Sequence, residues 1–299
     1  MRLRVVVPHF FREDIVGSNG GYGSGRLGNQ FPRSVALGRC LGSILALNRS
    51  PVDWILNIAE DHLESTSPST ASFLHGIEVE LHVFVTGSNC LQDILEVYEP
   101  RLHLHRQDLE DPRQLPLTAV RWLLDQSSSS ADYHMYFEDD LVIQDSSYVD
   151  KLAWFSRRTD NRFVLMPHRY EPTVANAPQR LYVDGPIKEI DKAEQIWASD
   201  EVVIASGRFL GGQEVSFCEA SNPHSGSFCV SASQLDQLRQ EVWPPKSFIG
   251  PLETAATGIF LGHFPILKPS WMCREFLCIE HGNPSFLGCM GELPYRKVL

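Results

Sequence analysis

The sequence has no excess of positive charge and no long hydrophobic run. Its 26 Lys and Arg residues face 37 Asp and Glu residues, so the formal net charge is −11. Because this charge repels phosphate backbones and anionic lipids, we expect neither sequence-independent nucleic-acid binding nor electrostatic membrane docking. No apolar run approaches the roughly 18 residues of a membrane-spanning helix, and the first apolar stretch is too short for a signal peptide. We therefore expect a cytoplasmic protein without a transmembrane segment.

Several common motifs are also missing. The seven cysteines are odd in number and contain no CxxC pair, which indicates neither a disulfide framework nor a structural zinc site. The chain has no GxGxxG or GxxxxGK[ST] loop, and it has no GxSxG or HExxH motif. These absences disfavour the common dinucleotide-binding, P-loop and hydrolase classes.

The sequence does contain an alternation of strand and helix patterns. Short apolar or β-branched runs predict strands over 3–8, 52–59, 79–85, 102–105 and 133–137, and amphipathic patterns predict helices over 33–48, 91–98 and 117–124. Alternation of this kind is typical of parallel strands with helices on both faces. We therefore predict an α/β fold, with a mostly parallel, Rossmann-like sheet flanked by helices in a single large domain.

Three adjacent acids interrupt a buried strand pattern. The apolar segment 133–137 runs directly into Glu138, Asp139 and Asp140, and Leu141 resumes the apolar run. Buried ionised carboxylates are costly unless a cation accompanies them, and the carboxyl ends of strands are where α/β sheets bind ligands. Mg²⁺ or Mn²⁺ together with nucleotide phosphates would satisfy these groups. A solvated turn between two strands is the alternative.

In this setting the acids resemble the DxD motif of the GT-A superfamily of nucleotide-sugar glycosyltransferases, with Glu138 in place of the first Asp. The resemblance implies a metal-dependent enzyme in which Asp140 binds Mn²⁺ or Mg²⁺. It also implies that Glu138 and Asp139 contact the nucleotide-sugar donor. We assign the same donor contact to Pro8, which ends the first strand, and to Gly226, in a small-residue strand beside the donor sugar.

The order of elements downstream also resembles GT-A enzymes. It implies that residues 1–145 form the donor-binding half and residues 146–299 the acceptor-binding and catalytic half of the same domain. Pro251 suits the first position of a helix, which places Glu253 in its first turn. In inverting members the catalytic base is an acid of this kind, so Glu253 is the candidate base; its alternative role is to interact with the helix dipole alone.

A late histidine often completes the metal shell in GT-A enzymes, and His281 is the candidate here. A structural histidine is the alternative. Together these assignments predict transfer of a sugar from a nucleotide-sugar donor to a carbohydrate or other hydroxyl acceptor in glycan biosynthesis, with inversion at the anomeric carbon. The rival functions are a metal-dependent nucleotidyltransferase and a non-catalytic carbohydrate-binding protein.

The glycine-rich stretch 17–28 is a second candidate for ligand contact. Within it begins the segment 25–31, which resembles a fragment of the motif that opens some GT-B fucosyltransferases. Those enzymes also carry an HxRRxD sequence, which this chain lacks. We therefore expect a nucleotide-facing loop or a surface loop there, and not a GT-B enzyme.

Overall fold

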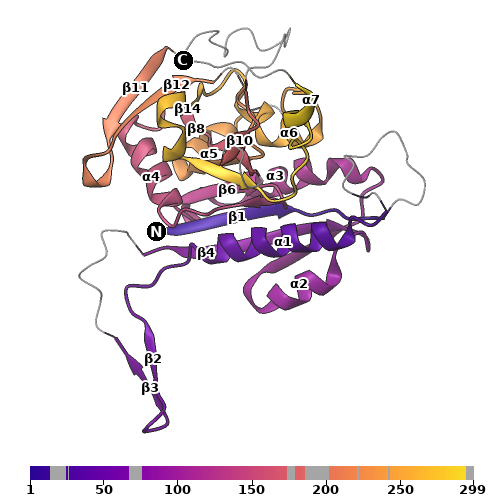
Figure 1. Cartoon of the computed structure of the whole chain (residues 1–299), viewed down its shortest axis with the longest axis vertical. Coiled ribbons are helices and arrows are strands. Elements are labelled where there is room, and N and C mark those ends of the chain that lie inside the picture. The colour runs from indigo at the N-terminus through magenta and orange to yellow at the C-terminus, as the bar shows by residue number, and fades with distance from the viewer. Residues whose placement is uncertain are drawn as a thin grey trace.

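A five-stranded sheet lies at the centre of the protein. The computed structural model describes residues 1–13, 25, 27–66, 76–173, 179–185, 202–220, 222–241 and 243–293. The central sheet has the order β13-β6-β1-β4-β5 (Figure 1). Its parallel strands are β1 (Arg2–Pro8), β4 (Glu78–Thr86), β5 (His103–Gln107) and β6 (Tyr133–Phe137), and β13 (Ser227–Ser231) runs antiparallel to β6. The predicted mostly parallel α/β sheet is confirmed.

Helices cover both faces of this sheet. Figure 1 shows α1 (Gln30–Leu45) and α2 (Gln92–Tyr98) below β1, and most other elements above it. Alternating residues of β1 enter different cores: Leu3, Val5 and Val7 pack with α1, and Val6 packs with α3 (Leu115–Asp125). Because successive side chains of a strand point to opposite faces of the sheet, β1 packs against the helices on both faces. The remaining helices are α4 (Tyr148–Arg158), α5 (Ala232–Leu238), α6 (Pro251–Ala256) and α7 (Cys289–Glu292).

Two smaller sheets lie above the central one, with the orders β10-β9-β15-β7 and β11-β12-β14-β8. The first contains β7 (Leu141–Val142), β9 (His168–Pro172), β10 (Arg180–Tyr182) and β15 (Cys278–His281). The second contains β8 (Val164–Leu165), β11 (Val203–Arg208), β12 (Glu214–Glu219) and β14 (Ile266–Pro269). Because the chain passes from β6 into β7 through the three acids, the acids lie where the central sheet meets the first of these sheets.

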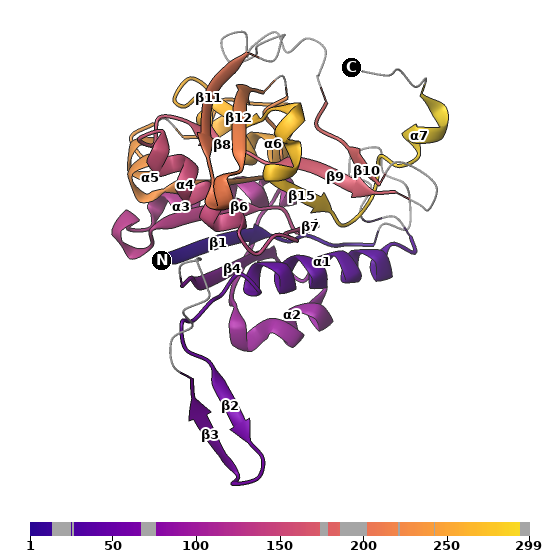
Figure 2. The same cartoon turned by 60° about the vertical axis from the view of Figure 1, so that its left-hand side comes forward.

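The segment 52–59 corrects one expectation. It does form a strand, β2 (Trp54–Asn57), but β2 pairs only with β3 (His62–Ser65) and takes no place in the central sheet. The resulting hairpin extends away from the body in both views (Figure 2). Trp54 is 69% exposed and Leu56 is 61% exposed. Strand propensity was correct here, but a local antiparallel partner replaced the expected parallel one.

The two halves predicted at the boundary 145/146 share one sheet. β13 comes from the second half and pairs along the whole of β6 from the first. The boundary between donor and acceptor contacts stays a prediction, since it concerns ligands. Within the described ranges, no helix combines the length and apolar character that crossing a membrane requires.

His168 gives the fold a pH-dependent stability. It is 4% exposed, its Nε2 lies 2.7 Å from the Pro269 carbonyl oxygen, and its ring stacks on Trp271. Burial lowers the pKa of His168 to about 4. Between about pH 6.5 and pH 4, His168 is therefore protonated in the unfolded chain but not in the folded chain. The contribution of neutral His168 to the free energy of unfolding is present above pH 6.5 and is lost as the pH falls towards 4.

The free energy of unfolding of the wild type is expected to fall between pH 7 and pH 5, and this fall is expected to be roughly 2 kcal/mol smaller in His168→Phe. The figure follows from a His168 pKa of about 4 in the folded chain and 6.5 in the unfolded chain. Urea denaturation at the two pH values measures this difference. His62→Phe, on the exposed hairpin, is the control. Equal pH dependence in wild type and His168→Phe would contradict the assignment.

Candidate functional site

The three acids lie at the carboxyl end of β6 beside cationic side chains; Glu138 is buried, and Asp139 and Asp140 are partly buried. Arg33 donates from Nη2 to both Asp139 oxygens at 2.7 Å and from Nη1 to Asp140 Oδ2 at 2.9 Å. His9 Nδ1 lies 2.6 Å from Asp139 Oδ2. The cation that the buried acids require is therefore supplied at least in part by the chain itself.

Arg33 reaches the acids because it lies on the buried stripe of α1. The stripe continues through Leu37, Cys40, Leu41 and Ile44 at helical spacing. Although burial disfavours its charge, the neighbouring carboxylates of Asp139 and Asp140 raise the pKa of Arg33 above its ordinary value. The sequence analysis assigned it no role in the site. An arginine on an otherwise apolar helix face is the signal that would have found it.

His281 joins Asp140 from β15. Its Nε2 lies 3.5 Å from Asp140 Oδ2, and its Nδ1 lies 2.8 Å from Glu171 Oε1. Burial opposes a charge on the imidazole, but Asp140 and Glu171 together raise the pKa of His281 to about 9. The structure thus brings the predicted pair Asp140 and His281 together. Here the imidazole is protonated at neutral pH and bridges two carboxylates.

Two carboxylates of the site have buried oxygens without partners. Glu138 Oε1 and Glu253 Oε2 accept no hydrogen bond in the described structure. Burial raises the pKa of Glu138 to about 8; the Arg169 charge opposes this shift, while the charges of Asp140 and Glu253 add to it. Glu253 stands in the first turn of α6, with Pro251 first in the helix as predicted. The structure therefore places Glu253 close enough to Glu138 for their charges to interact.

A second buried charge cluster adjoins Glu138. Asp184 accepts hydrogen bonds from the backbone NH and the guanidinium of Arg169 at 2.9–3.0 Å, and from Lys268 Nζ at 3.1 Å. Arg169 Nη1 and His224 Nε2 each lie 4.0 Å from Glu138. These groups, which sequence reasoning missed, place a fixed positive charge beside the acids. They come from separate strands and loops, so no local pattern marked them.

Pro8 and Gly226 line the same end of the sheet. Pro8 ends β1, two residues past the pairing of Val6 with Tyr136. The Gly226 carbonyl oxygen accepts a hydrogen bond of 3.0 Å from the Glu138 backbone NH. Their predicted contact with a donor stays a prediction. The glycine-rich stretch 17–28 lies almost wholly outside the described residues.

The oxygen atoms around the acids fit a divalent cation only in part. The unpartnered oxygens of Glu138 and Glu253 and the partly buried Asp140 carboxylate fit a hard cation, which prefers carboxylate ligands. Among the described residues, however, the groups with three ligand atoms within 4.8 Å of one another lie elsewhere, on β4–β5 and on the hairpin. A metal ion at the acids would therefore need ligands from a bound substrate. The predicted roles of Asp140 and His281 as metal ligands stay predictions.

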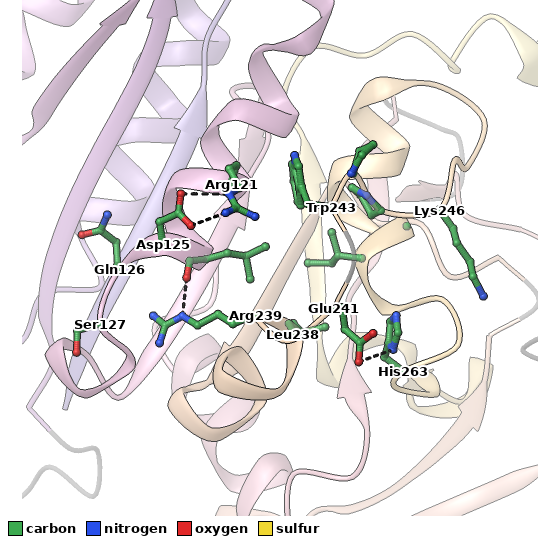
Figure 3. Close-up of a pocket in the computed structure, with 15 residues that line it drawn as sticks. Arg121, Asp125, Gln126, Ser127, Leu238, Arg239, Glu241, Trp243, Lys246 and His263 are labelled. Atoms are coloured by element: carbon green, nitrogen blue, oxygen red, sulfur yellow. Dashed lines mark hydrogen bonds and ion pairs between the residues drawn. The ribbon is translucent and has the colours of Figure 1, made fainter.

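A cavity of about 730 Å³ lies away from the acids (Figure 3). It is lined by the end of α3 and the segment after α5, including Trp243, Lys246 and an ion pair between Glu241 and His263. The end of α3 leads into the start of β6, so the cavity lies towards the amino ends of the parallel strands. Ligands of α/β sheets bind at the carboxyl ends, which favours the acid cluster as the functional site.

Comparisons with known proteins identify neighbours in structure alone. No family model matches the chain, and no curated protein matches it in sequence. Among solved structures, the chain is similar to S. aureus TarS (residues 1–349), with a TM-score of 0.42 and 12% identity over 90% of this chain and 58% of that one. The structure of S. aureus TarS in complex with UDP-GlcNAc is similar with a TM-score of 0.40 and 12% identity, over 90% of this chain and 56% of that one.

A CMP:2-keto-3-deoxy-manno-octonic acid synthetase complexed with CTP is also similar, with a TM-score of 0.38 and 12% identity over 90% of both chains. This chain spans less than two thirds of the TarS chains it matches. Similarity of this degree concerns the arrangement of strands and helices.

Proposed function

We propose that the protein is a glycosyltransferase that moves a sugar from a nucleotide-sugar donor to an acceptor hydroxyl, using Mn²⁺ or Mg²⁺. One observation carries the proposal: Glu138, at the carboxyl end of a parallel strand, and Glu253, in the first turn of α6, each have a buried carboxylate oxygen without a partner, and their charges interact. Such a site can bind a cation with a diphosphate and can also accept a proton. The resemblance of residues 138–140 to a DxD motif supports the same function.

The roles of the charged residues follow from their positions. Asp140, with His281 after it gives up its proton, would bind the metal ion, which supplies positive charge to the departing nucleoside diphosphate. Arg33 holds the carboxylates of Asp139 and Asp140 in place through its forked donors. Arg169 keeps a positive charge beside Glu138 without being able to lose it.

Glu253 is the proposed base. An acceptor hydroxyl has a pKa far above neutral, so its attack on the anomeric carbon requires a carboxylate that takes the proton as the new bond forms. The start of a helix favours the ionised carboxylate. A single displacement of this kind inverts the anomeric configuration, so an α-linked donor is expected to give a β-linked product.

The test is a panel of nucleotide sugars and nucleotides, including UDP-GlcNAc and CTP, incubated with Mn²⁺ or Mg²⁺ and candidate acceptors. Release of nucleoside diphosphate together with a glycosylated product supports the proposal. Release of pyrophosphate supports the alternative of a nucleotidyltransferase, and binding without turnover supports the alternative of a carbohydrate-binding protein.

Asp140→Ala is expected to abolish transfer while the circular dichroism spectrum stays native. Normal turnover by this variant would remove Asp140 from the site.

Gly226→Ala tests whether the position of Glu138 matters. Gly226 has φ +65°, and a β-carbon added there would lie 2.6 Å from Glu138 Oε2. We expect turnover to fall by about 100-fold, because a shift of about 1 Å in a group that positions the donor can cost that much. Gly211, with φ +74° and nothing near its added β-carbon, is the matched control.

Both alanines carry the same backbone strain, of roughly 1–2 kcal/mol. Gly211→Ala is therefore expected to lose stability and keep its turnover, measured side by side with Gly226→Ala. Equal turnover in the two variants would show that Glu138 has no defined position to preserve.

A further inference from the structure

A cluster of histidines on β4 and β5 lies apart from the acids. Glu80 and His82 stand two residues apart on β4, so they share one face of the sheet, and His103 is the register partner of His82 on β5. Their ligand atoms all lie within 4.8 Å of one another. The sequence analysis assigned no role to these residues, and the proposed transfer reaction does not use them.

His82 has a ring nitrogen that no hydrogen bond satisfies. Its side chain is 7% exposed, and Nε2 lies 3.1 Å from Glu80 Oε1 without the geometry of a hydrogen bond. The other ring nitrogen, Nδ1, lies 2.9 Å from His105 Nε2. When Nδ1 carries the proton and donates it to His105, the lone pair of Nε2 faces Glu80. A hydrogen bond of this kind on the second nitrogen is what orients histidine ligands of metals.

Glu80 is oriented in the same way. Arg4 donates from Nε to Glu80 Oε2 at 2.9 Å, and its Nη2 lies 2.8 Å from the same oxygen. The other oxygen, Oε1, is left facing His82. The separation of 3.1 Å between Oε1 and Nε2 is close to the roughly 3.3 Å between two ligands of a tetrahedral ion with bonds near 2.0–2.1 Å.

The cluster has a closed side and an open side. Trp122 of α3 packs 4.4 Å from the His82 ring, and the His103 ring stacks on His82 at 4.7 Å. Glu80 is 40% exposed in its side chain, His103 is exposed, and β5 is the edge strand of the sheet.

We propose that Glu80, His82 and His103 form a Zn²⁺ site that is separate from the acid cluster, with water as the fourth ligand and His105 as a positioning residue. Two imidazoles and one carboxylate suit Zn²⁺ better than Mg²⁺ or Ca²⁺, which prefer oxygen ligands alone. Three protein ligands with one open position are typical of zinc sites that exchange their water. The exposed group Glu60, His62 and Glu64 on the hairpin has one histidine and no buried ring nitrogen, so it makes the matched control.

The test uses the full chain, stripped of metal with EDTA and dialysed. Competition with a chromogenic chelator is expected to give one Zn²⁺ per chain in the wild type. His103→Ala, at an exposed edge position that leaves folding intact, is expected to weaken Zn²⁺ binding by at least about 100-fold, and His105→Ala by about 10- to 100-fold. Co²⁺ in place of Zn²⁺ is expected to show the intense visible absorption of a four-coordinate ion, lost in His103→Ala.

Two controls separate this site from others. His62→Ala and Asp140→Ala are both expected to bind Zn²⁺ as the wild type does. Absence of Zn²⁺ binding in the wild type would overturn the proposal, and so would unchanged affinity in His103→Ala. Loss of the bound ion in His62→Ala or Asp140→Ala would place it on the hairpin or at the acids instead. The proposed transferase function does not depend on whether Glu80, His82 and His103 bind Zn²⁺, whereas loss of the ion in Asp140→Ala would support a metal site at the acids.

Discussion

Glu253→Gln is expected to lower turnover by about 100-fold or more, while donor binding stays near that of the wild type. Glutamine keeps the size of the side chain and its place in the first turn of α6, but it cannot accept the acceptor's proton. The unpartnered Glu253 Oε2 makes this variant informative, because no structural hydrogen bond to that oxygen is lost. Steady-state kinetics give the change in turnover, and calorimetric titration of the donor gives its affinity.

A matched control separates proton transfer from the helix dipole. Asp93 occupies the first turn of α2, outside the site, as Glu253 does in α6. Asp93→Asn removes the same kind of interaction with a helix N-terminus, worth roughly 0.3–1 kcal/mol, and is expected to leave turnover unchanged.

The stereochemistry of the product provides an independent check on Glu253. Near-normal turnover in Glu253→Gln would remove this residue from the mechanism, and so would a product that keeps the donor's anomeric configuration. Either result would leave the acid cluster and the donor site open to a retaining mechanism. Nuclear magnetic resonance of the first-formed product distinguishes the two anomers.

Asp184→Ala is expected to destabilise the protein by about 3–5 kcal/mol. The Asp184 side chain is fully buried between Arg169 and Lys268, whose side chains are 11% and 4% exposed. Removing the carboxylate takes away the partner that both buried positive charges share, and leaves Arg169 only the Glu138 oxygen 4.0 Å away. Burial, together with the Arg169 charge, already lowers the pKa of Lys268 to about 8 even though Asp184 opposes that shift. Urea denaturation monitored by circular dichroism measures the loss.

Two further variants test the charge as the cause. Asp125→Ala breaks an exposed pair with Arg121 and is expected to change stability little, because exposed ion pairs contribute little. Adding Lys268→Met to Asp184→Ala removes one uncompensated charge and is expected to recover part of the lost stability. A double variant no more stable than Asp184→Ala would assign the loss to a cavity instead of charge.

The sequence by itself determined the elements and the position of the acids. The periods of apolar residues predict β1, β4, β6, α1 and α3 because burial of one face is a local property of the chain. Proline and the acid after it predicted the start of α6 at Pro251. Adjacent acids at the end of an apolar strand predicted a buried site at residues 138–140, since a strand's end in an α/β sheet lies at its ligand-binding edge.

Only the tertiary structure decided which groups surround those acids. Arg33, Arg169 and His281 reach residues 138–140 from more than 25 positions away in the chain. Asp184 joins from the loop after β10 and Lys268 from β14. Pairing between charges that are distant in the chain depends on how helices and strands pack together, and the local spacing of apolar residues does not contain this information. The same reason explains the hairpin: strand propensity in 52–59 is local, whereas the choice between a neighbouring strand and the central sheet is made by the whole fold.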